Sequence, residues 1–135
     1  MIPAFPVDDW SEITKQGKNA KVGNQTLENW FSVFEKHLPS IKKNKQLCFI
    51  GHSLGCQTIL RYLETLPEGK KVGAIICVAG FFTLVNLEGP EQEALAKPWL
   101  VTSIDTNKVI YIANKIVLIL SDDDQWVKVD PNQRL

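Results

Sequence analysis

Residues 51–55 read Gly-His-Ser-Leu-Gly, a pattern that places one serine between two glycines. A short apolar run precedes the pattern and apolar residues at helical spacing follow it, which predicts a strand, a sharp turn and a helix. Gly51 and Gly55 would leave room where the strand and helix backbones approach each other. Ser53 would then lie at the apex of the turn with its hydroxyl exposed, as a nucleophile for acyl transfer requires.

The helix after this turn would direct its free amides toward Ser53, where they would stabilise developing negative charge. The backbone amide of Leu54 is the predicted oxyanion donor, because it follows the nucleophile directly. His52 belongs to the same turn, but its side chain would diverge from the serine hydroxyl and pack or hydrogen-bond locally. The pattern also fits a tight turn in a doubly wound sheet that has no chemistry. We predict a nucleophile elbow, the strand-turn-helix of α/β hydrolases.

A serine nucleophile needs a base and an acid that orients the base. Asp122, Asp123 and Asp124 follow an apolar run over residues 115–120, so they would lie at the carboxyl end of a strand, where open α/β sheets place their sites. The order serine before aspartate is also that of α/β hydrolases. A solvated acidic turn is the alternative interpretation.

The chain contains two histidines, His37 and His52. His37 is in a predicted helix well before the serine, where it would be solvated or would interact with the helix dipole. No histidine follows Asp124. The catalytic triad is therefore not completed by these residues.

The apolar pattern predicts an α/β fold with a parallel sheet. Buried strands are expected over residues 47–51, 72–80 and 115–120, and helices over residues 24–41 and 54–65. A Gly89-Pro90 break should precede a short helical stretch over residues 91–97, whereas residues 99–114 are ambiguous between helix and strand. Two successive crossovers would give a three-layer α/β/α sheet of α/β-hydrolase type within one domain, residues 1–135.

The amino-acid composition limits the partners, location and cofactors that we expect for this chain. Fifteen basic and 15 acidic side chains among 135 residues give no net charge, so neither nucleic acid nor an anionic membrane is an expected partner. No apolar run is long enough to cross a bilayer, and the start lacks the features of a signal peptide. Cys48, Cys56 and Cys77 fall on predicted buried elements, which favours reduced thiols in a cytoplasmic protein. The sequence has no spacing typical of metal ligands and no phosphate-binding loop, so we expect neither a metal nor a cofactor. A nucleotide-binding domain is therefore a weak alternative.

With the serine turn and the segment Ser-Asp-Asp-Asp-Gln-Trp-Val over residues 121–127 in view, the chain resembles a known family. It is similar to the small single-domain serine hydrolases typified by retinoblastoma-binding protein 9. The resemblance implies hydrolysis of a small ester, thioester or amide through an acyl-Ser53 intermediate. It also implies that Asp124 is the triad acid, with Asp123 the next best match. No cofactor is implied.

Members of this family also carry a glycine-rich strand and loop before the elbow and a histidine segment after the acid. The present sequence lacks both, so it looks like the middle of a family member, truncated at both ends. An inactive remnant or a binding module that retains the sheet is the alternative function. Either way, we expect the unpaired edge of strand 47–51 to promote self-association and esterase activity to lie near background.

Overall fold

The computed structural model describes residues 29–30, 32–33, 36, 47–133 and 135. Contacts divide the chain into two compact units, Met1–Pro39 with Leu87–Thr102 and Ser40–Asn86 with Ser103–Leu135. The second unit holds the β-sheet and the serine and aspartate candidates. It therefore carries the candidate site.

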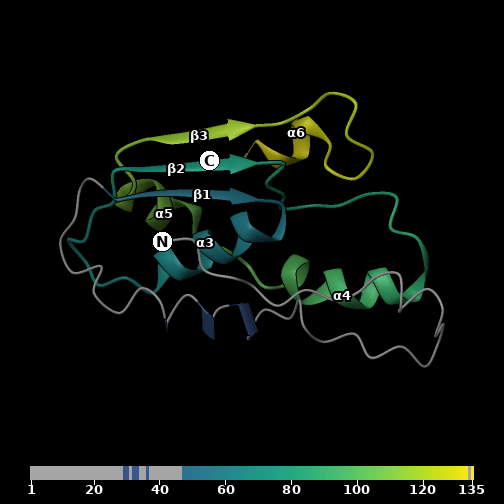
Figure 1. Ribbon diagram of the computed structural model, residues 1–135, viewed down its shortest axis with the longest axis horizontal. Coiled ribbons are helices and arrows are strands. Elements are labelled where there is room, and N and C mark those ends of the chain that lie inside the picture. The colour runs from purple at the N-terminus through teal and green to yellow at the C-terminus, as the bar shows by residue number, and fades with distance from the viewer. Residues whose placement is uncertain (1–28, 31, 34–35, 37–46, 134) are drawn as a thin grey trace. The chain divides into compact units, whose positions relative to one another are not determined.

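The sheet consists of three parallel strands in the order β1-β2-β3 (Figure 1). The strands are β1 (Cys48–His52), β2 (Ala74–Val78) and β3 (Ile116–Ile119). Ile50 of β1 is the partner of Ile76, which in turn is the partner of Val117 of β3. The predicted parallel sheet is confirmed, although the strands are shorter than expected or, for β1, displaced by one residue.

Two helices of this unit connect the strands. Helix α3 (Leu54–Glu64) joins β1 to β2, and α5 (Thr106–Ile112) joins β2 to β3. A short α6 (Val129–Asn132) follows β3. Helix α3 contacts both β1 and α5. Because right-handed crossovers that proceed in one direction place their helices on one face of a sheet, α3 and α5 cover the same face.

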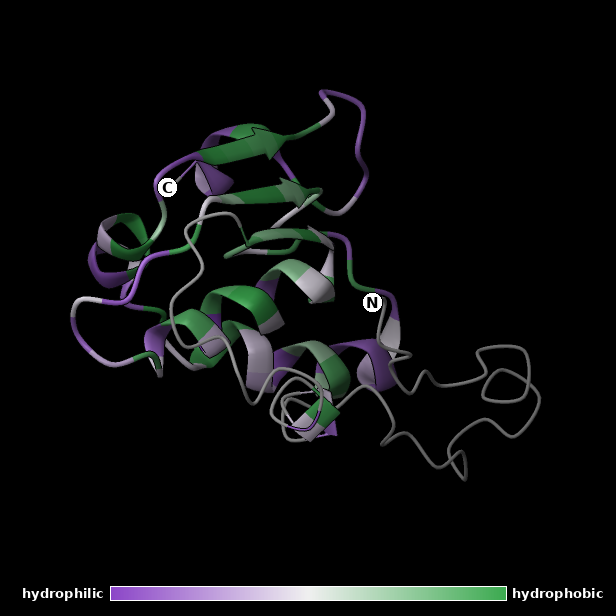
Figure 2. Cartoon of the chain, turned by 60° about the vertical axis from the view of Figure 1, so that its left-hand side comes forward, coloured by the Kyte–Doolittle hydropathy of each residue, from purple (hydrophilic) through white to green (hydrophobic). Residues whose placement is uncertain are grey.

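Alternating burial distinguishes the two faces of β1. Phe49 and Gly51 are buried on the helix side, and the Phe49 ring lies 6.4 Å from the ring of Tyr62 on α3. Cys48, Ile50 and His52 are exposed on the other side. Figure 2 shows the strands in the green of apolar residues, as a sheet with an apolar core requires.

The cysteine prediction was correct for two of three residues. Cys56 and Cys77 are buried free thiols, whereas Cys48 is a free thiol that is exposed. Cys48 is exposed because it occupies the outer face of β1, on the opposite side from the residues that contact α3. An apolar run does not by itself show whether a strand is covered on one face or on both.

The ambiguous segment before β3 forms the helix α5. The Asp105 side chain accepts a hydrogen bond of 3.0 Å from the amide of Lys108, which caps the helix N-terminus. Val109 and Ile112, three residues apart, are both buried. Burial at helical spacing therefore outweighs the strand preference of these β-branched residues.

In the other unit, Gly89 and Pro90 begin a helix instead of forming a break before it. Helix α4 (Gly89–Val101) is longer than the predicted stretch 91–97 and contains Pro98. Proline is well tolerated at a helix start, because its missing amide would have no acceptor there. The ring of Trp30 lies 6.1 Å from that of Trp99 in an edge-on arrangement. The described residues of the predicted helix 24–41 are helical, and the remainder lies outside the described residues.

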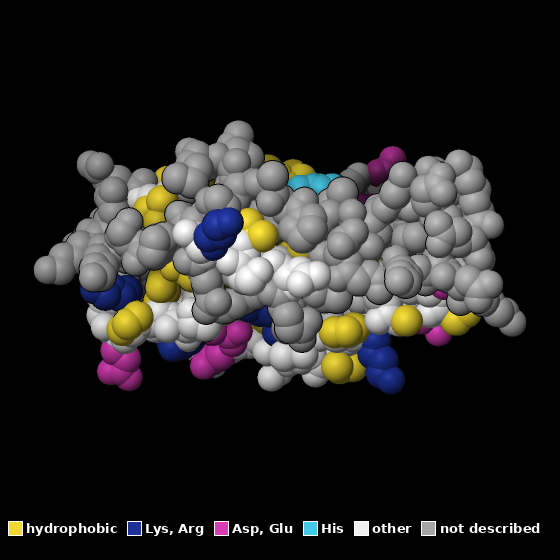
Figure 3. Space-filling model, turned by 60° about the horizontal axis from the view of Figure 1, so that its bottom comes forward, with side chains coloured by type: hydrophobic (Ala, Val, Ile, Leu, Met, Phe, Trp, Pro, Cys, Tyr) yellow, Lys and Arg dark blue, Asp and Glu magenta, His cyan; other side chains and the backbone are white. Residues whose placement is uncertain are grey.

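The described surface carries charges of both signs. On the face drawn in Figure 3, basic and acidic side chains are interspersed with apolar ones, and neither sign forms one large patch among the described residues. Among these residues, no helix combines the length and the apolar character needed to cross a membrane.

Self-association stays a prediction, and β1 is the strand on which to test it. Strand β1 is an edge of the described sheet, and Ile50 on its outer face is 71% exposed. Ile50→Lys adds the kind of charge that blocks edge pairing, so it should shift sizing-chromatography profiles toward the monomer. Ile110→Lys on α5 is the matched control, since Ile110 is 47% exposed away from the sheet edge. A wild-type chain that elutes as a monomer at every concentration would contradict the prediction.

Candidate active site

Ser53 lies at the junction of β1 and α3 with φ 52° and ψ −120°, outside the regions that ordinary residues occupy. Its amide donates a 2.9 Å hydrogen bond to the carbonyl of Val78, the last residue of β2. Its own carbonyl accepts a 2.9 Å hydrogen bond from the amide of Cys56 in the first turn of α3. The predicted strand-turn-helix with a strained serine at its apex is therefore present. The hydroxyl forms no capping hydrogen bond to α3.

Gly51 is required by the close approach of α3 to β1. A Cβ at this position would lie 2.8 Å from the amide nitrogen of Cys56 and 2.8 Å from the Cδ1 atom of Ile59. Gly55 differs, because a Cβ there would meet nothing within 4 Å among the described atoms. The prediction that both glycines make room is wrong for Gly55, which occupies an uncrowded position in the first turn of the helix.

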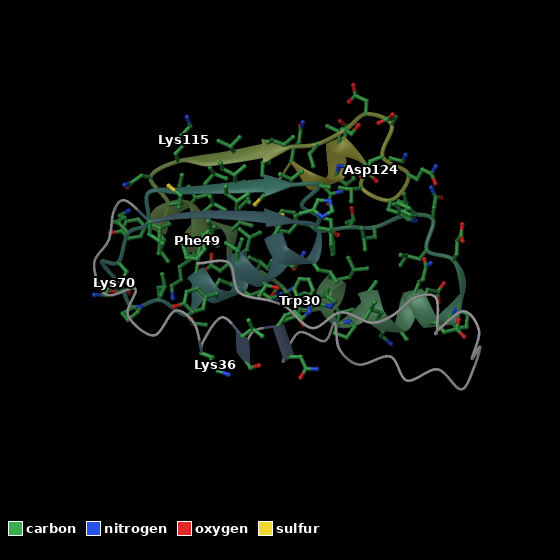
Figure 4. All side chains as sticks on the ribbon, viewed as in Figure 1. Trp30, Lys36, Phe49, Lys70, Lys115 and Asp124 are labelled. Carbon is green, nitrogen blue, oxygen red and sulfur yellow. The ribbon has the colours of Figure 1, made fainter. Side chains whose placement is uncertain are left out.

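Asp124 lies in the turn after β3, beyond the carboxyl ends of the strands, whereas Lys115 lies at the opposite end of β3 (Figure 4). Its Oδ1 atom accepts hydrogen bonds from the amides of Trp126, at 2.8 Å, and Val127, at 2.9 Å. These two bonds are the main cause that lowers the pKa of Asp124 below its ordinary value. The carboxylate is therefore held in its ionised form. Its Oδ2 atom accepts no hydrogen bond in the described part of the chain, so one oxygen is available to orient another group.

The neighbouring carboxylates are arranged differently. The Oδ1 atom of Asp123 accepts a hydrogen bond from the hydroxyl of Ser121 within the same turn, and Asp122 and Asp123 are both exposed. Asp124 is half-buried and is fixed by two backbone amides. Of the three carboxylates, that of Asp124 has the most defined orientation.

His52 is exposed at the end of β1, at the same edge of the sheet. A coulombic interaction with His52 is the weakest of the effects that lower the pKa of Asp124, so the two side chains lie within electrostatic range of each other. His37 lies outside the described residues. Within the described ranges, no group of three or more metal-ligating side chains comes together.

The turn that carries Asp124 is attached to the loop that follows β2. The amide of Val85 donates to the carbonyl of Trp126 at 3.0 Å, and the side-chain amide of Asn86 donates to the carbonyl of Gln125 at 2.8 Å. Asn86 adopts a positive φ of 54°, a conformation that asparagine tolerates better than most residues. Figure 2 shows the turn after β3 in the purple of polar residues.

Sequence reasoning missed two buried polar residues near this edge, Gln57 and Asn132. Gln57 accepts a 3.0 Å hydrogen bond from Arg61 and donates one to the carbonyl of Phe81 in the loop after β2. A glutamine within the apolar run of α3 signals an internal partner, since buried polar groups are normally paired. Asn132 gives no such signal, because the residues around it in the sequence are polar.

An open cavity of about 560 Å³ lies away from these residues, beside the end of α3 and along α5. It is lined by Pro67, Glu68, Gly69, Asp105, Lys108, Tyr111 and Ile112. None of the predicted catalytic or oxyanion residues lines it. The cavity is therefore not part of the candidate site.

The hydrogen bonds between the Asp124 carboxylate and two backbone amides should make the stability of the fold depend on pH. Because the pKa of Asp124 is lowered by folding, its ionised form stabilises the fold above its ordinary pKa, about 3.9, and this stabilisation is lost as the pH falls below that value. Asp124→Asn should therefore lower Tm at pH 7, and the difference from wild type should shrink as the pH falls below about 4 and vanish only below the lowered pKa of the folded state. Thermal unfolding from pH 7 downward measures this. Asp122→Asn is the control, and a Tm difference equal to that of Asp124→Asn would contradict the assignment.

Comparison with known proteins shows to which protein family the chain belongs. A family model described as serine hydrolase matches residues 9–135, nearly the whole chain. The chain therefore belongs to the serine hydrolase family.

The similarity of the chain to individual proteins agrees with this family assignment. The chain is 36% identical over 102 residues to "Putative hydrolase YdeN" of Bacillus subtilis (strain 168), a match that covers 75% of this chain and 50% of that protein. It superposes on the crystal structure of the ydeN gene product from B. subtilis with a TM-score of 0.65 and 27% identity, covering 91% of this chain and 66% of that one. The chain thus spans about half the length of its curated relative. The fold is α/β-hydrolase-like.

Proposed function

We propose that this chain hydrolyses a small ester, thioester or amide through an acyl intermediate on Ser53. The observation that carries the proposal is the strained turn that holds Ser53 between β1 and α3, with φ 52°. Such strain is costly and is commonly maintained at functional sites. Membership of the serine hydrolase family supports the same chemistry.

In the proposed reaction, the Ser53 hydroxyl oxygen attacks the substrate carbonyl carbon and its proton passes to a base. The carbonyl oxygen becomes an oxyanion beside the N-terminus of α3. The amide of Leu54 is free to donate to it, because the first amides of a helix have no acceptor within the helix. Collapse of this intermediate releases the alcohol, thiol or amine. Water then hydrolyses the acyl-Ser53 and releases the acid.

Asp124 is the proposed acid that orients the base. Two backbone amides hold its Oδ1 atom, which leaves Oδ2 available for an imidazole N–H. Asp123 is the weaker candidate, since its Oδ1 atom is already bonded to Ser121. Among the two histidines, His52 lies on the outer face of β1 and His37 is not described, so we assign neither as the base.

Two finer expectations accompany this proposal. The turn over residues 121–127 favours the subgroup of serine hydrolases typified by retinoblastoma-binding protein 9. A cytoplasmic location is proposed because the three cysteines are free thiols, which are typical of reducing compartments.

A fluorophosphonate probe tests the proposal, because it reacts with an activated serine. With imidazole added as the proton acceptor, we expect labelling of the wild-type chain and none of Ser53→Ala. Ser103→Ala is the matched control, since Ser103 is exposed and its side chain has no role in the proposed site. Equal labelling of Ser53→Ala would show that Ser53 is not the nucleophile. Unlabelled wild-type chain would favour a catalytically inactive binding module.

A further inference from the structure

Asn132 is a buried polar residue at the end of α6, with only 1% of its surface exposed. Its Oδ1 atom accepts hydrogen bonds from the amides of Phe82, at 2.6 Å, and Thr83, at 2.9 Å. Its Nδ2 atom donates to the carbonyls of Thr83, at 3.2 Å, and Lys128, at 2.8 Å. The side-chain amide therefore uses both its oxygen and its nitrogen.

These bonds join two segments that are distant in the sequence. Phe82 and Thr83 belong to the loop after β2, whereas Lys128 immediately precedes α6. A second attachment between the same two regions is the hydrogen bond from Val85 to Trp126. The loop after β2 is thus bound to the chain on both sides of Val127.

The backbone that Asn132 holds at Lys128 is also next to the amides that bind the candidate acid, Asp124. The amides of Trp126 and Val127 hold the Oδ1 atom of Asp124, and Lys128 follows Val127 directly. The Lys128 ammonium also donates a 2.6 Å hydrogen bond to the Asp124 carbonyl. Movement of Lys128 would therefore move both the amides and the cation that surround Asp124.

Helix α6 has four residues, Val129–Asn132, and a helix of this length is not stable on its own. Something outside the helix must hold it. The side chain of Asn132 does so, because it bonds the residue before the helix and the loop after β2 together.

We propose that Asn132 is a positioning residue, which orients the carboxylate of Asp124 by fixing the Trp126–Lys128 backbone to the loop after β2. Its significance for hydrolysis rests on the proposed function of Asp124. Its effect on the geometry of the turn does not.

Asn132→Leu removes the hydrogen bonds of this side chain at nearly constant side-chain size, and the pKa of the Asp124 carboxyl, followed by NMR titration, is the readout. We expect that pKa to rise toward its ordinary value of about 3.9, because the amides of Trp126 and Val127 lose their fixed positions. Gln133→Ala, an exposed neighbour, should leave it unchanged. Val109→Ala should lower the free energy of unfolding, because Val109 is buried in the core, and should leave the pKa of Asp124 unchanged. A shift in Asn132→Leu no larger than in Val109→Ala would overturn the proposal.

Should Asn132→Leu fail to fold, Asn132→Ser with hydrogen exchange at Trp126 and Val127 tests the same claim. These amides should exchange about tenfold faster than in wild type, as expected when one or two hydrogen bonds are lost. Unchanged exchange would overturn the proposal. Neither readout requires activity, so a wild-type chain without a reactive serine would refute the proposed function and leave this inference standing.

Discussion

Gly51→Ala is expected to lower the free energy of unfolding by about 2–3 kcal/mol, a large loss for one methyl group. The new Cβ would lie 2.8 Å from the amide nitrogen and 2.9 Å from the Cα atom of Cys56. Both are backbone atoms at the start of α3, so no side-chain rotation relieves the contact. Helix α3 would have to move away from β1, and the turn that holds Ser53 would move with it.

Gly55→Ala makes the same chemical change four residues away and is the matched control. A Cβ there meets nothing within 4 Å among the described atoms, and alanine is favoured over glycine in helices by about 0.5–1 kcal/mol. We expect unchanged or slightly higher stability. Urea denaturation of both variants measures the difference. Similar losses in the two variants would contradict the close approach of α3 to β1 at Gly51.

The second large effect concerns the base that the proposed reaction requires. General-base catalysis contributes about 10²–10⁴-fold to a rate, so hydrolysis of p-nitrophenyl acetate by this chain should lie near background. Added imidazole should raise the Ser53-dependent rate by about tenfold or more, because it supplies a proton acceptor beside a positioned hydroxyl. Asp124 need not orient a base that diffuses freely.

Ser53→Ala provides the control for this assay, because imidazole also hydrolyses the ester in free solution. The rate with Ser53→Ala should equal that of imidazole alone at every concentration. A wild-type chain with substantial Ser53-dependent turnover in the absence of imidazole would show that one of its own residues acts as the base. A wild-type rate identical to that of Ser53→Ala would leave no support for a nucleophilic Ser53.

The parts of the fold that the sequence predicted are those in which one local pattern determines the structure. The apolar run before Gly51 and the helical spacing after Ser53 allow only a strand, a turn and a helix, and this is the arrangement of β1 and α3. The parallel sheet followed because two crossovers link three apolar strands.

The errors, and the segment that the sequence left ambiguous, arose where tertiary context decides the structure. Val109 and Ile112 favour strands by propensity, yet burial at helical spacing places them in α5. Cys48 is as apolar as its neighbours, but only the inner face of β1 is covered by α3. The surroundings of Gly55 depend on the packing angle of a helix, which a sequence pattern does not specify.

The candidate site was predicted unevenly for the same reason. Ser53 is signalled by its flanking glycines. The position after an apolar strand signals the aspartates of residues 122–124 together, and the family resemblance alone favours Asp124 among them. The hydrogen bonds that distinguish Asp124 from Asp123 come from the backbone of the turn, and backbone amides have no sequence signature. The contacts of Asn132 join residues 49 and 50 positions apart, a separation that local patterns cannot reveal.

The most direct test of the central claim is to find where an acyl group attaches to this chain. The wild-type chain is incubated with p-nitrophenyl acetate and imidazole, quenched in acid and mapped by peptide mass spectrometry. We expect acetyl on the peptide that contains Ser53, and none on the corresponding peptide of Ser53→Ala. Acetyl found only on lysines or on other serines, with the Ser53 peptide unmodified, would contradict an acyl-Ser53 intermediate.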